Sequence, residues 1–346
     1  MLGFYFSGNG VANKKLVSLY ILTYNQEGFI RQAIDNATQQ TYAPLEIIVS
    51  DDYSSDMTWD IVKQAVADYK GPHSIIARRN ERNLGISPHI NEVWKYCSGD
   101  WIVASAGDDI SLPDRVERIM EVVEVDKSIK LVQSWIEEVD ADGNPLKLNR
   151  LNCHSDPGAL RLYGLEARIN GTSYHPHGAA MAYSRDVVDK FSPLPPGIIF
   201  EDNIVNLRAE LLGRAGVLAL PLVKHRNHSG QVTSAAGAES EDKIRERIRL
   251  RLDSDVLSSQ QSLADITAKR EGLKAQQYRR IVKCYRKRLR YFIWKRKALI
   301  YTWPVRLFYL AFLLVRPKLA PLSIIDVKRS LIPKRIYVNL KNMRQR

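Results

Sequence analysis

The segment Trp101-Ile102-Val103-Ala104-Ser105-Ala106-Gly107-Asp108-Asp109 carries the strongest signal for how this chain folds. Its apolar part has the composition of a buried strand, and its small residues indicate a turn that ends in two neighbouring acids. Two carboxylates this close repel each other, so both stay ionised only where a cation or strong hydrogen bonds hold them. The pair predicts Mg²⁺ or Mn²⁺, with water and a phosphate ester as the other ligands. A solvated turn before Ser111-Leu112-Pro113-Asp114 fits the same residues, so the pair alone leaves both interpretations open.

Short apolar runs alternate with amphipathic stretches from Leu16 to Trp135. This alternation predicts an α/β fold with a mostly parallel central sheet that helices cover on both faces. We expect strands near Val17–Leu22, Glu46–Ser50, Ser74–Arg78 and Trp101–Ala104, and helices near Glu27–Gln39, Met57–Tyr69 and Ser87–Tyr96. Ligands of such sheets lie beyond the carboxyl ends of the strands.

The rest of the chain predicts a closing part of this domain and then a helical appendage. A hairpin at Asp140–Asn144, a helix near Asn203–Leu212 and a strand near Val217–Leu222 complete the domain. The small residues 234–238 predict a linker, and a long charged helical stretch follows from Glu241 to about Lys297. The expected organisation is a domain at 1–235, a linker and charged helix at 236–277, and a basic amphipathic region at 278–346.

Four segments of the first half carry a family resemblance. They are Val17–Glu27, Ile47–Asp56, Arg82-Asn83-Leu84-Gly85 and Ala106–Asp109. In this order and spacing they resemble the nucleotide-sugar-binding half of family 2 glycosyltransferases, which have the GT-A fold. The resemblance covers roughly Leu16 to Thr233 and implies a sugar transferase that uses a nucleotide-sugar donor and a divalent metal.

The resemblance also implies donor-binding residues at the ends of the first three strands. They are Thr23, Tyr24 and Glu27 in the nucleotide pocket, Asp52 as an acceptor from the base, and Asn83 and Gly85 in the loop beneath the nucleotide. For Asp56, before the second helix, the N-cap preference of aspartate favours a structural role.

The acidic turn takes its roles from the same resemblance. Asp108 would lie near the ribose and the sugar, and Asp109 would ligate the metal that bridges the diphosphate. The segment 225–233 resembles the Arg-x-His-x-x-Asn-x-Ser pattern through Arg226 and His228, with Gln231 where asparagine is usual. His228 is therefore a candidate for the metal site, and a structural histidine fits its position equally well.

Phe200-Glu201-Asp202-Asn203 resembles the Glu-Asp pair of the family, whose aspartate is the catalytic base. An acceptor hydroxyl becomes a good nucleophile only as its proton is removed, and a positioned carboxylate speeds this by ~10²–10⁴-fold. Asp202 is the expected base of a single displacement with inversion, and a helix N-cap is the competing role. For His175 and His177 an ordinary loop position is favoured over a place in the acceptor pocket.

The positive charge of the chain lies at its C-terminal end. Residues 278–346 hold 20 lysines and arginines against one acid, Asp326, whereas the other residues hold 31 against 37 acids. Cations alternate with aromatic residues and precede the apolar stretch Ala298–Val315, which predicts an interfacial helix on an anionic membrane. A solvated basic face is the alternative. Three scattered cysteines and the absence of a charged region before the first apolar residues indicate that the globular part is cytoplasmic. The basic end favours peripheral or monotopic attachment to the cytoplasmic face of the membrane.

These observations predict an inverting glycosyltransferase that adds one sugar to a lipid-linked glycan during surface polysaccharide synthesis. The chain lacks the Gln-x-x-Arg-Trp motif of processive synthases. Two alternatives remain, a nucleic-acid-binding protein with a basic arm and a non-catalytic sugar-nucleotide-binding module. The run Phe308–Val315 and the negative balance of the globular part speak against nucleic acid as a partner. The helical stretch from Glu241 offers a surface for a homo-oligomer.

Overall fold

The computed structural model describes residues 14–151, 153, 155–228, 231 and 241–300. The chain forms two compact units, which we call the sheet unit and the helical unit. The sheet unit comprises Met1–Leu194 and Glu201–Ser234, and the helical unit comprises Pro195–Phe200 and Ala235–Arg346. The three-part organisation expected from the sequence stays a prediction.

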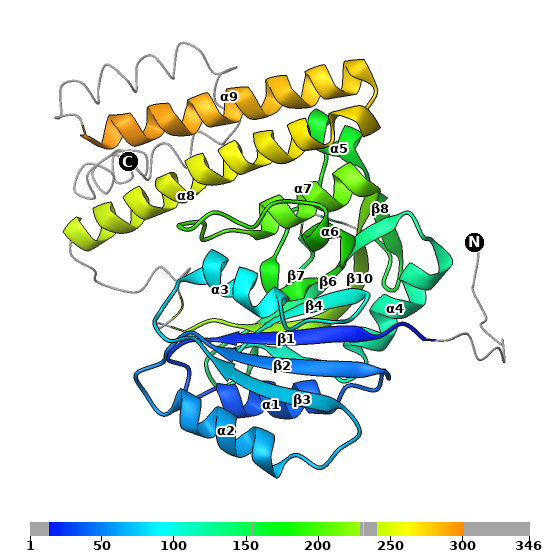
Figure 1. The fold of residues 1–346 in the computed structure, drawn as a ribbon, viewed down its shortest axis with the longest axis vertical. Coiled ribbons are helices and arrows are strands. Elements are labelled where there is room, and N and C mark those ends of the chain that lie inside the picture. The colour runs from blue at the N-terminus through cyan, green and yellow to red at the C-terminus, as the bar shows by residue number, and fades with distance from the viewer. Residues whose placement is uncertain (1–13, 152, 154, 229–230, 232–240, 301–346) are drawn as a thin grey trace, which may run out of the picture. The chain divides into compact units, whose positions relative to one another are not determined.

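The sheet unit alternates strands and helices along the chain (Figure 1). Its strands are β1 (Val17–Thr23), β2 (Leu45–Asp51), β3 (Ser74–Arg79), β4 (Trp101–Ala106), β5 (Ile110–Ser111), β6 (Ile129–Val139), β7 (Pro145–Asn149), β8 (Leu160–Tyr163), β9 (Met181–Ser184) and β10 (Arg214–Arg226). Its helices are α1 (Ile30–Thr38), α2 (Thr58–Asp68), α3 (Ile86–Trp94), α4 (Arg115–Val125), α5 (Leu165–Asn170), the 3₁₀ turn η1 (Gly178–Ala180), α6 (Asp186–Asp189) and α7 (Asp202–Leu212).

The sheet is mixed, with the order β3-β2-β1-β4-β9-β6-β10-β5. Strands β3, β2, β1 and β4 are parallel, as the alternation of strands and helices predicts. Strand β9 then runs antiparallel to both β4 and β6, while β6 and β10 are parallel to each other. The α/β class with a central sheet is confirmed: β3, β2, β1 and β4 form one parallel block, and β9 separates it from the parallel pair β6 and β10.

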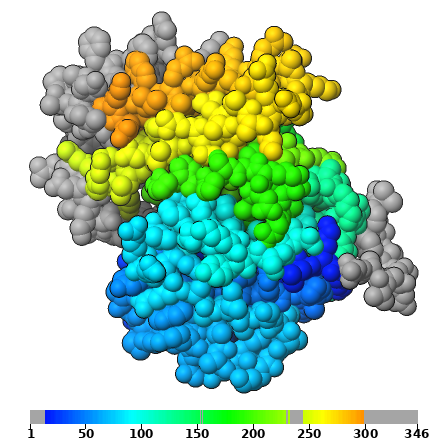
Figure 2. Space-filling model, in the orientation of Figure 1, coloured from blue at the N-terminus to red at the C-terminus, as the bar shows by residue number. Residues whose placement is uncertain are grey.

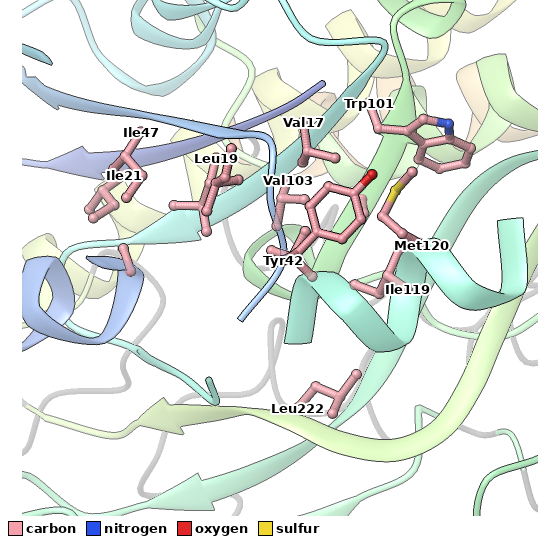
Figure 3. Packing of buried hydrophobic residues seen from close by; sticks show 14 of the residues in the cluster. Val17, Leu19, Ile21, Tyr42, Ile47, Trp101, Val103, Ile119, Met120 and Leu222 are labelled. Atoms are coloured by element: carbon pink, nitrogen blue, oxygen red, sulfur yellow. The ribbon is translucent and has the colours of Figure 1, made fainter. Parts of the chain in front are cut away.

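The core lies between β1, β4 and the helices of one face (Figure 3). Leu19 and Ile21 of β1 are inaccessible to solvent, as is Ile119 of α4, and Met120 beside it is 1% exposed. Burying such side chains stabilises the fold by about 1.5–3 kcal/mol each. The strand ends that follow this core are therefore fixed in position, and the candidate site lies at these ends.

The helical unit is a pair of long helices, α8 (Glu241–Ala268) and α9 (Ala275–Ile300), which lie side by side (Figure 1). Leu252 and Val256 of α8 form a buried cluster with Phe292 of α9. The charged helical stretch expected from Glu241 to about Lys297 consists of two helices, because the 3₁₀ turn η2 (Arg270–Gly272) and the extended Leu273 separate α8 from α9. The break allows α9 to return along α8 and to bury the apolar side of both helices.

None of the helices in the described part of the chain combines the length and the apolar composition needed to cross a membrane. The predicted linker at 234–238 and the apolar run Phe308–Val315 lie outside the described residues.

Candidate active site

The acidic turn after β4 is buried. Asp109 is 2% exposed and Asp108 is 7% exposed, which excludes the solvated turn. Asp109 Oδ1 accepts a hydrogen bond from the backbone N–H of Arg226 at 3.0 Å and lies 3.0 Å from His225 Nδ1. The antiparallel pairing of β5 with β10, in which Ser111 faces Val223, brings the end of β10 to this turn.

One oxygen of Asp109 is available for a ligand. Its Oδ2 is buried and has no hydrogen-bond partner among the described residues. The same holds for Thr23 Oγ1 and Gln26 Oε1, which lie 2.9 and 2.5 Å from where a β-carbon on Gly107 would stand. Buried polar atoms without a partner cost free energy, so unpaired oxygens gathered at one turn indicate a ligand site.

The donor set at the turn fits a metal that takes most of its ligands from elsewhere. No group of three histidine, cysteine or acidic side chains that could hold an ion occurs among the described residues. Mg²⁺ and similar ions are commonly held by one or two carboxylates together with substrate phosphates and water. Asp109 Oδ2 matches that pattern, because it is a carboxylate oxygen without another partner.

Asp108 contacts a different histidine. Its Oδ2 lies 3.0 Å from His228 Nε2, and the His228 ring packs against Phe29 at 4.6 Å between centroids. Burial, together with the charge of Asp109, raises the pKa of Asp108. His228 is thus in contact with Asp108. The assignment of His228 as a metal ligand stays a prediction.

Two histidines connect the acidic turn to the loop before β9. The rings of His225 and His177 meet edge to face, with their centroids 4.6 Å apart. Burial lowers the pKa of His225, but its hydrogen bond to Asp109 and the charges of Asp109 and Asp108 outweigh burial and raise it. Burial and the neighbouring His225 lower the pKa of His177 to about 4, so His177 is neutral at physiological pH.

The loop that carries His177 is held by a buried glutamine. Gln133 of β6 donates from Nε2 to the His175 carbonyl at 3.0 Å and accepts the His177 N–H at 3.2 Å. Directly after His177, a β-carbon on Gly178 would lie 2.9 Å from Glu201 Oε1. The glycine therefore lets the Glu201 carboxyl group approach the loop backbone, and this loop links the acidic turn to the Glu-Asp pair.

The Glu-Asp pair stands where α7 begins. Asp202 Oδ1 accepts the N–H of Asn203 at 2.7 Å and the Asn203 side-chain amide at 3.0 Å. Burial, together with the charge of Asp202, raises the pKa of Glu201 to about 8. Glu201 therefore keeps its proton at neutral pH.

Asp52 holds the loop that precedes α3. It is 4% exposed, and its Oδ1 accepts from the Asn80 side chain at 2.7 Å and from the Leu84 N–H at 2.9 Å. Its Oδ2 accepts the N–H of Gly85 at 2.9 Å, which also reaches Asn83 Oδ1 at 2.9 Å. These contacts position the loop at the strand end, while a hydrogen bond from Asp52 to a base stays a prediction.

The remaining predicted donor residues lie at the end of β1. Thr23 is buried and Tyr24 is 44% exposed. Glu27 Oε2 accepts the N–H of Met57 at 2.9 Å. Asp56 has the structural role expected for it, since its Oδ1 accepts the N–H of Thr58 at 3.0 Å, but it is not the N-cap of α2, a position that Met57 occupies.

Sequence reasoning missed three contributors to the site: His225, Gln26 and Arg115. Arg115 is inaccessible to solvent and donates to the carbonyl oxygens of Ala104 and Ala179 at 2.8 Å. It thus ties the end of β4 to η1. An arginine in the first turn of an amphipathic helix has no sequence signal for burial, whereas His225 could be suspected from its place beside Arg226.

Solved structures show which fold this is. Staphylococcus aureus TarS, residues 1–349, in complex with UDP aligns with a TM-score of 0.55 over 91% of this chain and 83% of that chain, at 15% identity. The same protein in complex with UDP-GlcNAc aligns with a TM-score of 0.51 over 81% of this chain and 92% of that chain, at 15% identity. The sheet unit accordingly has the GT-A fold of glycosyltransferases.

The sequence pattern of glycosyl transferase family 2 matches residues 18–191. The chain belongs to that family. An uncharacterized glycosyltransferase of Methanocaldococcus jannaschii is 34% identical over 40% of this chain and 47% of its own length, so the match spans about half of that relative. An uncharacterized glycosyltransferase of Nostoc is 24% identical over 85% of this chain and 92% of its own length. A chondroitin synthase of Escherichia coli is 31% identical over 37% of this chain and 18% of its own length.

Proposed function

We propose that this protein transfers one sugar from a nucleoside-diphosphate sugar to a hydroxyl group of a growing polysaccharide, with inversion at the anomeric carbon. Family membership supports the reaction type. The chondroitin synthase relative supports a polysaccharide product, and the UDP and UDP-GlcNAc complexes of TarS support a nucleotide-sugar donor.

The observation that carries the proposal is the series of contacts from Asp109 to Glu201. Asp109 lies 3.0 Å from His225, whose ring packs on His177. The next residue, Gly178, leaves room for the Glu201 carboxyl group, and Asp202 follows Glu201 directly. A carboxylate that can hold the donor end and a carboxylate that can accept a proton therefore share one part of the sheet unit.

Asp202 is the base in this proposal. The acceptor oxygen forms a bond to the anomeric carbon while the bond from that carbon to the diphosphate oxygen breaks. The hydroxyl proton passes to Asp202 as the new bond forms, and the electron pair of the broken bond leaves with the nucleoside diphosphate. Glu201 retains its own proton because its pKa is raised to about 8, so Asp202 is the carboxylate of the pair that is placed to accept one.

In this proposal the donor binds beside the acidic turn, where Asp109 Oδ2, Thr23 Oγ1 and Gln26 Oε1 have no hydrogen-bond partner among the described residues. Asp109 Oδ2 would hold Mg²⁺ or Mn²⁺, and a bound divalent ion supplies positive charge that offsets the charge developing on the leaving diphosphate. Asp52 and Asn83 fix the backbone of the loop up to Gly85 through three hydrogen bonds of 2.9 Å. A loop held in this way orients a nucleotide without reorganisation on binding.

The acceptor in this proposal is a lipid-linked glycan. The basic C-terminal region supports it, because a protein that works on an acceptor held in an anionic membrane gains from 20 lysines and arginines within 69 residues. A nucleic-acid partner is not expected. A homo-oligomer through the helices from Glu241 stays a prediction. Within the chain, α8 packs on α9.

The test is a panel of nucleotide sugars in thermal shift assays with and without Mn²⁺, followed by transfer assays with the sugar that stabilises the protein. We expect one base and one sugar to stabilise it, and NMR of the product to show the anomeric configuration opposite to that of the donor. Retention of the anomeric configuration would exclude a single-displacement mechanism. Stabilisation without transfer to any glycan or lipid-linked acceptor would favour the sugar-nucleotide-binding module.

A further inference from the structure

The outer face of α9 carries a row of cations that α8 does not neutralise. Helix α9 has ten lysines and arginines and no acid. Four of them, Arg279, Lys283, Arg286 and Arg290, stand at i, i+4, i+7 and i+11, which places them on one side of the helix. We call these four residues the basic row. At a rise of about 1.5 Å per residue the row is ~16 Å long.

Two acids of α8 interact with cations of α9 that lie outside the basic row. Asp253 pairs with Arg296 at 2.5 Å. Burial raises the pKa of Asp255, and the charges of Arg288 and Lys295 oppose that shift, so these two cations face Asp255. The basic row, by contrast, makes no ion pair with a carboxylate among the described residues. Like charges three and four positions apart repel one another, so the row is held at a cost in stability.

The row borders a shallow groove on the surface of α9. Tyr278 and Val282 line this groove together with the four cations. Figure 2 shows the α9 atoms, in orange, at the surface of the helical unit. Trp294, one turn beyond Arg290, is 50% exposed on the same helix. Cations with an exposed tryptophan suit the interface of a bilayer, where the indole ring sits at the level of the headgroups.

We propose that the basic row binds the phosphate groups of an anionic lipid bilayer and holds α9 along the membrane surface. Charge complementarity favours a membrane, because the row offers four cations that have no carboxylate partner in the part of the chain that the structure describes, and α9 contains no acid. The sequence favours a bilayer over a nucleic acid, since α9 leads into the apolar run Phe308–Val315 and residues 1–277 carry more acids than cations. This inference does not depend on the proposed sugar transfer.

The test is sedimentation of the full chain with vesicles of phosphatidylcholine, with and without phosphatidylglycerol. The variant R279Q/K283Q/R286Q/R290Q removes the row. Each lysine or arginine at an anionic surface contributes roughly fivefold in partitioning, so the variant should bind the anionic vesicles at least about tenfold more weakly. Binding of the natural sequence should weaken as NaCl is raised.

The matched control removes four cations from exposed positions within or directly after helices of the sheet unit. Arg31, Lys63, Lys95 and Arg118 are each paired with an acid three or four residues away, and their side chains are 48–65% exposed. The variant R31Q/K63Q/K95Q/R118Q therefore has the same net charge as the row variant and should keep most of the vesicle binding. Circular dichroism and UDP titration of both variants separate a loss of membrane binding from a loss of fold or of donor binding.

Three outcomes would overturn the proposal. The first is equal loss in the two variants, which would mean that net charge alone drives adsorption. The second is unchanged binding of the row variant to anionic vesicles. The third is binding to single-stranded DNA or RNA that depends on the row, together with no preference for phosphatidylglycerol, which would make a nucleic acid the occupant.

Discussion

His225 Nδ1 lies 3.0 Å from Asp109 Oδ1, although the two residues are 116 positions apart in the chain. The carboxylate oxygen can only accept, so the imidazole donates from Nδ1. The backbone N–H of Arg226 donates to the same oxygen at 3.0 Å. Oδ1 is therefore engaged with the end of β10, and Asp109 has Oδ2 left for a ligand. A metal bound here would have one oxygen from this carboxylate and would depend on the donor diphosphate for others.

Removing that oxygen should remove the metal-dependent part of donor binding. In Asp109→Ala we expect calorimetric UDP affinity in Mn²⁺ to fall at least tenfold, about 1.4 kcal/mol, to the value that EDTA produces in the natural sequence. Asp114→Asn is the control, since Asp114 is a partly exposed acid that pairs with Arg118 at 3.1 Å. Equal UDP affinity of Asp109→Ala and the natural sequence in Mn²⁺ would remove Asp109 as a ligand.

Neutralising the proposed base should separate chemistry from binding. Asp202→Asn should lower kcat by ~10²–10⁴-fold, because the acceptor hydroxyl loses its proton acceptor, and should leave the Kd for UDP nearly unchanged. Asp60→Asn is the matched control, since Asp60 is also an acid in the first turn of a helix and its loss alters the helix terminus similarly. A transfer rate in Asp202→Asn equal to that of the control would exclude the base role.

The parallel half of the sheet could be predicted because its strands are short apolar runs between amphipathic helices. The observed β1 (Val17–Thr23) and β4 (Trp101–Ala106) lie within two residues of the expected bounds. The antiparallel strand β9 could not be predicted, because it is four residues long and its position depends on pairing with β4 and β6. Strand β10 extends well beyond the expected 217–222, with Pro221 at a shift in the pairing register.

The candidate site also has a part that the sequence predicts and a part that it does not. The positions of Asp109 after β4 and of Asp202 at the start of α7 could be predicted, because both elements have a readable pattern. Their connection could not, since it depends on His177 and Gly178 in an irregular loop that the buried Gln133 holds. His177 lies in a loop, the position favoured for it, and its ring packs edge to face on His225, a contact that the sequence does not predict. Contacts made by irregular segments leave no period in the sequence.

Glu201 should make stability depend on pH. A carboxyl group whose pKa is about 8 in the folded state and near its usual 4.5 when unfolded binds a proton more tightly when folded. Between these values the unfolded state releases the proton first, so stability falls as pH rises. In Glu201→Gln this loss is absent. Its melting temperature relative to the natural sequence should therefore increase steadily from pH 5 to pH 8 and then level off.

The size of that gain is on the order of a few kcal/mol at pH 8, because each unit of pKa shift corresponds to ~1.4 kcal/mol. Glu121→Gln provides the control, since the Glu121 side chain is 51% exposed and pairs with Arg118. A difference between Glu201→Gln and the natural sequence that stays constant across this pH range would show that Glu201 is ionised in the folded protein. Burial and the charge of Asp202 would then not raise the pKa of Glu201 above neutral pH.

The loop held by Asp52 depends on a glycine. Gly85 has φ 77° and ψ 170°, a conformation essentially restricted to glycine, and its N–H donates to Asp52 and Asn83. Gly85→Ala should cost ~1–3 kcal/mol in urea unfolding and should weaken UDP binding, because the loop must shift away from Asp52. Gly171→Ala is the control: Gly171 ends α5 at φ 72° and ψ 23°, an ordinary left-handed position that alanine occupies at a cost of ~1 kcal/mol. UDP affinity should be unchanged in Gly171→Ala. Equal UDP affinity in the two variants would show that the loop at Gly85 does not contribute to donor binding.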